Sequence, residues 1–128
     1  MPRSVRKLLI KMHVDAKQQH EATRGSDNFL AINNKLRYLR IDPLRGLPVP
    51  KSQIPEKYKD LDVNNLFKIS INDSLNAIYT VGSNEKEIIA LVIEFLDTEK
   101  FDETFANVDF GDEREAIVRE IDRQSSPE

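Results

Sequence analysis

Apolar and polar positions alternate near the N-terminus, across residues 5–14. From position 8 on, one parity is entirely apolar and comprises Leu8, Ile10, Met12 and Val14, whereas a leucine, a lysine and a histidine fill the other. Side chains on a β-strand point to alternate faces, so a repeat of two is typical of a strand. Residues 5–14 are therefore predicted to form a strand with one face on a core.

Two helices are predicted to follow this strand. The first is short and polar over residues 14–25, with Asp15 as its candidate cap and Gly25 to end it. The second covers residues 26–42, and Pro43 prevents its continuation. Its apolar residues recur at the spacing of one helix face: Phe29, Ile32, Leu36 and Leu39.

The second half of the chain has the pattern of a small sheet. A proline-rich connection precedes three predicted strands, separated by turn-forming residues, at roughly 64–71, 75–82 and 86–96. The third strand is apolar without alternation, as expected of a central strand covered on both faces. A short helix over residues 97–105 follows it. This order of elements predicts an α+β fold with an antiparallel sheet.

The compact part is predicted to end at Phe105, which divides the chain into a domain of residues 1–105 and a C-terminal tail of residues 106–128. The tail is acidic, and a possible helix over 112–123 has few apolar anchors. Such a segment is too short and too charged to be a stable helix alone. It is expected to be a short docked helix or disordered.

Composition places the chain among globular proteins. It has 128 residues, of which 39% are hydrophobic and 32% are charged, and this suffices for one domain with a core. No apolar run approaches the roughly 20 residues of a membrane span. Cysteine is absent from the sequence, which excludes disulfides and thiolate nucleophiles and fits a cytoplasmic protein.

The charges are unevenly distributed along the chain. Residues 1–60 carry 13 Lys and Arg against 6 Asp and Glu, whereas residues 61–128 carry 6 against 16. A basic half can meet phosphates, and an acidic tail can repel or mimic them. The alternative is that the gradient is only a solvated surface.

Common catalytic motifs are absent from the sequence. His13 and His20 have no zinc-site spacing, no G-x-S-x-G motif occurs, and the four glycines are too scattered for a phosphate loop. Neither a metal nor a cofactor is therefore expected. RNA cleavage through the 2′-hydroxyl stays open, because it needs only cations and a proton carrier.

A basic surface with interleaved aromatic residues is the strongest chemical signal. Clustered cations neutralise phosphates, and exposed tyrosines stack on single-stranded bases. The residues expected to bind RNA lie in the second predicted helix and in the connection after it: Arg37, Arg40, Arg45, Lys51, Lys57, Tyr58 and Lys59. For the arginines, the alternative is the ordinary preference of cations for a helix C-terminus.

Several phrases over residues 26–105 match a known family in the right order. They are GLPVPK (46–51), IPEKY (54–58), NLFK (65–68), YTV (79–81), IIALVIE (88–94) and DTEKFDETF (97–105). On these phrases the chain resembles the RelE/ParE superfamily of type II toxin–antitoxin toxins, in the RelE-like branch common in archaea and other prokaryotes. The resemblance implies a small antiparallel sheet packed against an N-terminal helical hairpin, with a short C-terminal helix.

The resemblance also implies how such a protein acts. RelE-like toxins are endoribonucleases (mRNA interferases) that enter the ribosomal A site, cut mRNA without a metal and so inhibit translation. ParE-like toxins inhibit DNA gyrase instead. Both are neutralised by a cognate antitoxin that wraps the toxin. The implied partners are therefore an antitoxin protein and the ribosome with its mRNA, and no membrane.

The positions that carry catalysis in the family have changed in this sequence. The strand lysine of the family matches Lys68, but a second basic residue falls at Ser70 and the usual arginine at Asn76. The histidine or arginine after the last strand falls at Thr98, and the terminal tyrosine falls at Phe101. Asparagine cannot supply the permanently charged fork of arginine, and phenylalanine cannot carry a proton. If cleavage survives, Lys68, Asn76 and Phe101 occupy its catalytic positions.

Three functions therefore stay open. The first is a RelE-like toxin directed at mRNA and the ribosome, with weakened or lost cleavage. The second is a non-catalytic binding module of the same fold that takes a ribosome or an antitoxin-like partner, and the third is ParE-like inhibition of gyrase. The acidic tail could fold onto the basic face as a built-in blocker, and a solubilising disordered tail is the alternative.

Overall fold

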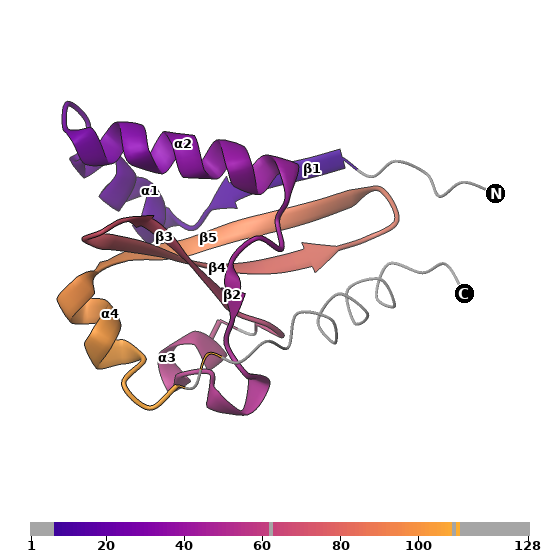
Figure 1. Ribbon diagram of the computed structural model, residues 1–128. Coiled ribbons are helices and arrows are strands. Elements are labelled where there is room, and N and C mark those ends of the chain that lie inside the picture. The colour runs from indigo at the N-terminus through magenta and orange to yellow at the C-terminus, as the bar shows by residue number, and fades with distance from the viewer. Residues whose placement is uncertain (1–6, 62, 109, 111–128) are drawn as a thin grey trace.

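The computed structural model describes residues 7–61, 63–108 and 110. One five-stranded sheet runs through the molecule, with α1 and α2 on one face and the short helices α3 and α4 on the other (Figure 1). The elements in chain order are β1 (Lys7–Met12), α1 (Val14–Ala22), α2 (Asp27–Ile41), β2 (Leu47–Pro48), the 3-10 helix η1 (Lys51–Gln53), α3 (Glu56–Lys59), β3 (Phe67–Asn72), β4 (Leu75–Ser83), β5 (Glu87–Asp97) and α4 (Thr98–Thr104).

The strands of the sheet follow the order β1-β5-β4-β3-β2. The pairs β3–β4 and β4–β5 are antiparallel, as predicted, and the short β2, which was not predicted, also pairs antiparallel with β3. In contrast, β1 pairs with β5 in parallel, with Lys7 opposite Glu87 and Met12 opposite Val92. The sheet is therefore mixed at this one edge. The alternation over residues 5–14 predicts which face of β1 is buried. It does not predict whether β1 pairs in parallel or antiparallel, because the alternation is the same in both cases.

The hairpin of α1 and α2 packs on one face of the sheet, as the resemblance implied. Ile32 and Leu39 of α2 are fully buried, and Leu36 packs against the same cluster. The helix stops where predicted, because Asp42 is extended (φ −141°) before Pro43. The buried residues beneath the hairpin form the first core cluster: Ala16, Ile32, Leu39, Phe67, Ile69, Ile71, Ala77, Tyr79, Val81, Ala90, Val92 and Phe95.

The opposite face of the sheet carries the second core cluster, covered by α3, α4 and residues that follow α4. Its buried members are Val49, Ile54, Tyr58, Leu66, Ile78, Ile93, Leu96 and Phe105. Val108 and Phe110 pack against this cluster, so compact packing continues beyond Phe105. The possible helix over 112–123 lies outside the described residues.

Helix capping follows the sequence at one helix and departs from it at another. The Asp97 carboxylate accepts a hydrogen bond from the Lys100 N–H at 2.8 Å, which starts α4 at its predicted position. At α1 the N-cap is His13, whose Nδ1 lies 3.3 Å from the backbone nitrogen of Asp15. The prediction of Asp15 as the cap is therefore wrong: the helix begins earlier, and Asp15 falls in its first turn.

β5 lies between β1 and β4 and is covered on both faces, which confirms the prediction from its unbroken apolar pattern. Its buried residues fall on both parities: Ala90, Val92, Ile93, Phe95 and Leu96. Beyond the point where a neighbouring strand ends, side-chain amides form hydrogen bonds with the strand backbone in its place. Gln19 exchanges two hydrogen bonds with the backbone of Phe95, at 2.8 and 2.9 Å, and Asn65 exchanges two with that of Val81, at 2.9 and 2.8 Å.

Candidate functional site

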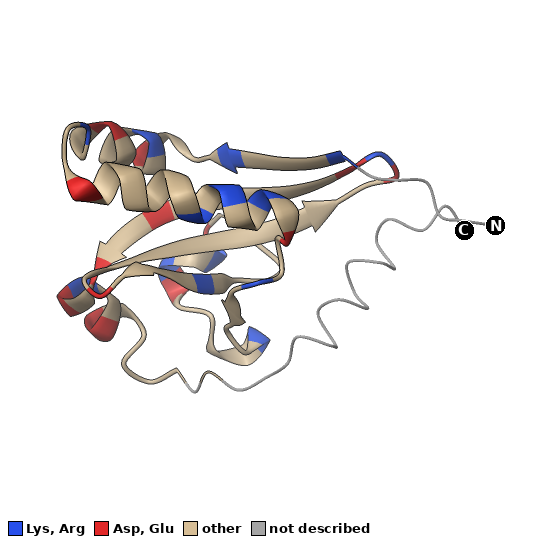
Figure 2. Cartoon of the chain, turned by 45° about the horizontal axis from the view of Figure 1, so that its top comes forward, with Lys and Arg blue, Asp and Glu red and all other residues tan. Residues whose placement is uncertain are grey.

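The residues expected to bind RNA are divided between the two sides of the sheet. Arg37 and Arg40 are exposed on α2, whereas Lys51, Lys57 and Lys59 are exposed on η1 and α3, across the sheet. Figure 2 shows basic residues on the second half of α2 and others on the short elements of the opposite side. The predicted basic surface therefore consists of two separate areas.

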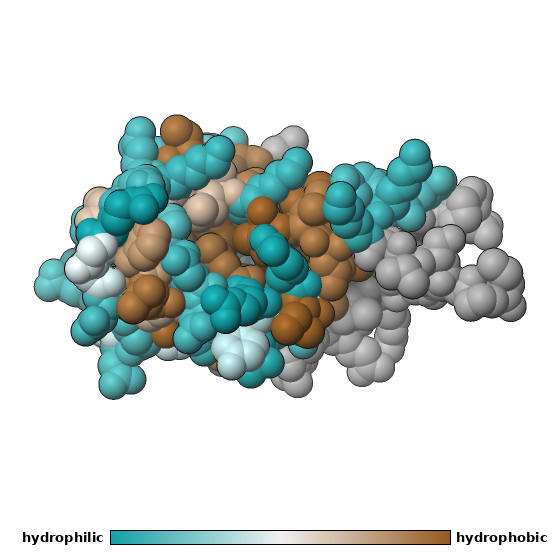
Figure 3. Space-filling view, turned by 90° about the horizontal axis from the view of Figure 1, so that it is seen from above, coloured by the Kyte–Doolittle hydropathy of each residue, from teal (hydrophilic) through white to brown (hydrophobic). Residues whose placement is uncertain are grey.

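The area on the hairpin side combines cations with exposed apolar residues. The Arg45 guanidinium lies 5.1 Å from the centre of the Tyr38 ring, and Tyr38 is 48% exposed. Ile41 is also exposed, at 73%. Figure 3, which looks onto the hairpin side, shows hydrophobic residues interspersed with hydrophilic ones. Such a mixture suits a protein partner as well as a nucleic acid.

The opposite face brings together most of the positions that the resemblance singled out. Lys68 of β3 lies opposite Ile78 of β4, which lies opposite Glu94 of β5, and in the next row Ser70 lies opposite Asn76. Directly opposite residues of antiparallel strands share a face. Because Ile78 belongs to the second core cluster, this row of side chains is on the side covered by α3 and α4.

Lys68 is held by aromatic rings. It is half-buried, and its Nζ lies 5.1 Å from the centre of the Phe101 ring and 6.0 Å from that of Phe110. The Phe101 ring also packs against Phe105 and Phe110, with centres 4.9 and 5.9 Å away. A cation over a ring face is attracted by the ring quadrupole. Phe101 therefore helps to position Lys68, although it lacks the hydroxyl of the family's tyrosine.

The neighbouring positions bring no further charge to Lys68. The Ser70 hydroxyl donates to the last backbone carbonyl of β3 at 3.0 Å, and the Thr98 hydroxyl donates to a carbonyl of the β3–β4 turn at 3.2 Å. Both side chains therefore stabilise the turn. Asn76 is half-buried one row from Lys68 and presents a neutral amide where the family has an arginine.

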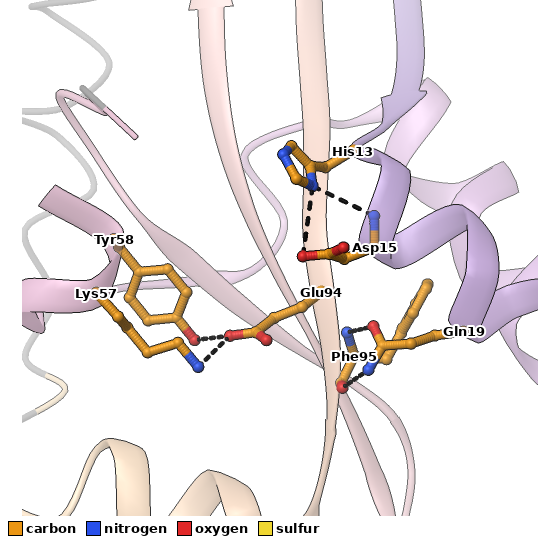
Figure 4. A network of polar contacts seen from close by, with 7 residues as sticks. All are labelled: His13, Asp15, Gln19, Lys57, Tyr58, Glu94 and Phe95. Carbon is orange, nitrogen blue, oxygen red and sulfur yellow. Dashed lines mark hydrogen bonds and ion pairs between the residues drawn. The ribbon is translucent and has the colours of Figure 1, made fainter. Parts of the chain in front are cut away.

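A second polar group of residues on this face joins α3 to β5 (Figure 4). The Tyr58 hydroxyl donates a short hydrogen bond to Glu94 Oε2, and Lys57 Nζ lies 2.9 Å from the same oxygen. Tyr58 is only 1% exposed and stacks on Phe105, with ring centres 5.8 Å apart. Burial raises the pKa of Tyr58 well above its usual range, and the hydrogen bond and negative charge of Glu94 raise that pKa further.

The prediction that Tyr58 is displayed for stacking on RNA bases is therefore wrong, because α3 turns its ring into the second core cluster. Lys57 is exposed, but its ammonium is already paired with Glu94. Glu94 itself was not predicted as a site residue. The one sequence signal is a single carboxylate within an apolar strand, and its partner Tyr58 is 36 residues away in the chain.

Neither a metal-binding cluster nor a membrane-spanning helix occurs in the described part of the chain. Within residues 7–61, 63–108 and 110, no three or more His, Asp or Glu side chains are arranged to hold a metal ion. In the same ranges, every helix is too short or too polar to cross a bilayer.

No protein-family model matches the chain, and no curated protein matches it in sequence. Among solved structures, the chain is similar to a YoeB/ParE toxin from Agrobacterium tumefaciens, with a TM-score of 0.51 and 17% sequence identity. The similarity covers 69% of this chain and 95% of that chain. The fold expected from the sequence is therefore confirmed, because this chain shares it with that toxin, and the chain extends beyond the shared part.

Proposed function

We propose that this protein is the toxin-like component of a type II toxin–antitoxin system, directed at mRNA on the ribosome, with weakened or lost cleavage. The RelE/ParE-like toxin fold supports the toxin-like role. The observation that carries the rest is Lys68, which lies on the sheet face opposite the hairpin but is surrounded by groups unsuited to the chemistry. On this proposal the face is a binding surface that has lost most of its catalytic apparatus.

Cleavage of RNA through its 2′-hydroxyl has three requirements. A base must take the proton of the attacking hydroxyl, a cation must stabilise the charge of the pentacoordinate phosphate, and an acid must protonate the leaving oxygen. Lys68 can supply the cation. Asn76 and Phe101 can neither give nor take a proton at neutral pH. The Tyr58 hydroxyl is buried and bonded to Glu94, which keeps its proton in place.

The partners follow from the proposed role. A toxin-like protein of this kind acts where translation takes place, in the cytoplasm, and a cognate antitoxin protein controls it. The exposed mixture of Tyr38 and Ile41 with Arg45 on the hairpin side supports a protein partner there. The ribosome and its mRNA would meet the opposite face.

Two alternative functions are supported by the same absence of charged residues at the expected catalytic positions. A non-catalytic binding module would use the fold only to hold a partner, and a ParE-like gyrase inhibitor needs none of the catalytic residues. Both fit a face in which an asparagine and a phenylalanine occupy the catalytic positions. These two alternatives differ from the main proposal in the target of the protein, which is a binding partner or DNA gyrase in place of mRNA on the ribosome.

Primer extension on an mRNA in a purified translation reaction tests the proposal. The samples are the wild type, Lys68→Ala, Asn76→Arg and, as a matched control, Lys86→Ala at an exposed lysine of the β4–β5 turn. We expect few or no cuts from the wild type and from Lys86→Ala, and ribosome-dependent cuts from Asn76→Arg, because the arginine restores a fixed charge beside Lys68.

Other outcomes separate the alternatives. Strong cuts by the wild type that vanish in Lys68→Ala would mean that cleavage has survived on a reduced set of residues. If no variant cuts or associates with ribosomes, the translation target is wrong. Inhibition of a supercoiling reaction by purified gyrase, with translation untouched, would then favour the ParE-like role.

A further inference from the structure

Phe110 returns to the sheet after α4 and lies against the aromatic rings around Lys68. Its ring centre is 5.9 Å from that of Phe101 and 5.8 Å from that of Phe105, and it is 6.0 Å from Lys68 Nζ. Phe110 is partly buried against the second core cluster. One side of the Lys68 ammonium therefore faces a ring that comes from beyond α4.

The route of the chain brings Phe110 to this position. The Val108 N–H donates to the Phe105 carbonyl at 3.1 Å, which turns the chain at the end of α4. Val108 then packs on the second core cluster, as does Phe110. Two apolar side chains outside α4 thus anchor this stretch to the face that carries Lys68.

We propose that Phe110, anchored by Val108, is a built-in cover of Lys68 that must move away before a phosphate group can pair with the ammonium. The identity of the phosphate ligand, an RNA strand, rests on the proposed function, whereas the cover itself rests on the ring contacts. The Lys68 ammonium lies beside the stacked rings of Phe101 and Phe110, so on that side it has lost part of its hydration shell and gained an attraction that salt screens weakly. A phosphate must replace that attraction in order to bind.

This cover works through ring packing and not through negative charge. Phe110 carries no charge, and its contacts are with Phe101, Phe105 and Lys68. An acidic segment that blocked a basic face would lose its effect as the salt concentration rises. The Phe110 cover should persist, because apolar packing is not weakened by screening of charges.

Chemical labelling of lysine amines measures the cover without any ligand. The labelling rate of Lys68, relative to the exposed Lys17 and Lys86 of the same molecule, is followed by peptide mass spectrometry. We expect Phe110→Ala to raise the relative rate of Lys68 by roughly threefold to tenfold, and Phe110→Trp to leave it low. Ile41→Ala, at an exposed position on the hairpin side, is the matched control and should change nothing.

Two shortened chains locate the covering residue. A chain that ends after Phe110 should label at Lys68 as the full chain does, and a chain that ends after Val108 should label faster. The proposal is overturned if Phe110→Ala leaves the relative rate at Lys68 unchanged. It is also overturned if removal of residues 111–128 alone raises that rate as much as Phe110→Ala does.

Binding of a single-stranded RNA oligonucleotide, followed by fluorescence anisotropy at fixed salt, then tests the consequence. Phe110→Ala should bind it several-fold more tightly than the wild type, and the gain should disappear in Lys68→Ala/Phe110→Ala. If labelling at Lys68 rises but no variant binds RNA, the cover stands and the proposed RNA-directed function fails. If the variants bind RNA equally and label equally, the cover fails and the function stands.

Discussion

The sheet face under the helical hairpin and the face under α3 and α4 are made by the same strands, yet they bury different kinds of residue. The first core cluster consists of apolar and aromatic side chains, and its members are at most 7% exposed. Beside the second cluster, the face also carries Lys68, Asn76 and Glu94. Because strand side chains alternate between faces, each strand contributes to both kinds of surface at once.

Each charged group on the second face has a specific neighbour. Lys68 lies over aromatic rings, and Glu94 accepts the hydroxyl of Tyr58 and pairs with Lys57. Buried or half-buried charges of this kind contribute little net stability, because their desolvation offsets much of the attraction. On the proposed function, this difference is a division of roles: the hairpin face mainly stabilises the fold, and the second face also keeps polar groups for binding.

Among the tests of this division, Leu39→Ala on the hairpin face should have the largest effect on stability. Leu39 is fully buried in the first core cluster, so its loss leaves a cavity. We expect the free energy of unfolding to fall by about 2–5 kcal/mol. Urea unfolding followed by circular dichroism measures the change.

Ile41→Ala is the control for this prediction, on the same helix and with the same kind of truncation. Ile41 is 73% exposed, so the free energy of unfolding should change by less than about 0.5 kcal/mol. Similar losses for the two variants would contradict the packing of α2 described above.

An intermediate effect is expected from Tyr58→Phe on the second face. The substitution keeps the ring against Phe105 but leaves Glu94 without its hydroxyl donor. At neutral pH the free energy of unfolding should fall by about 1.5–3 kcal/mol, the usual contribution of a hydrogen bond to a charged group. Urea unfolding at pH 7 measures it.

The wild type and Tyr58→Phe should also differ in how their free energy of unfolding depends on pH. Burial and Glu94 raise the pKa of Tyr58 in the folded state, so the folded protein keeps a proton that the unfolded chain releases above about pH 10. This contribution to stability is complete below that pH and is lost as the pH rises further. The wild type should therefore lose stability faster than Tyr58→Phe above about pH 10. Parallel curves for the two proteins would mean that Tyr58 is not buried beside Glu94.

Much of the fold could be predicted from hydrophobic patterns, because those patterns are local. The spacing of apolar residues in α2, the stop at Pro43 and the unbroken apolar run of β5 each predicted an element that the structure contains. The parallel pairing of β1 could not be predicted in this way, because alternation is the same for both directions.

The candidate site was harder to predict, because its contacts are remote in sequence. Tyr58 looked like an exposed residue in a basic connection, and only its partner Glu94 and its neighbour Phe105 draw it inward. The strand amides pose the same difficulty: Gln19 bonds to a backbone 76 residues away. The position of Lys68 on its strand could be predicted from the sequence. The contact between Lys68 and the ring of Phe110 could not.

The smallest effect is expected from Lys57→Met, which removes the charge paired with Glu94 and keeps most of the side-chain length. Lys57 is 52% exposed, so solvent screens the pair and its loss should cost at most about 1 kcal/mol, with less at high salt. The measurement is urea unfolding at low and high salt. Lys59→Met is the control, because Lys59 lies 4.0 Å from Glu56 with both side chains exposed, and it should have no measurable effect.

This last prediction bears most directly on the second face. If Lys57→Met is nearly neutral for stability, the Lys57–Glu94 pair is not what holds α3 on the sheet, and the ammonium is free to exchange Glu94 for a phosphate. In that case Lys57→Met should weaken binding of single-stranded RNA and reduce its salt dependence, whereas Lys59→Met should do so less. A loss of several kcal/mol for Lys57→Met would instead make the pair part of the core, and the division between a stabilising face and a binding face would fail.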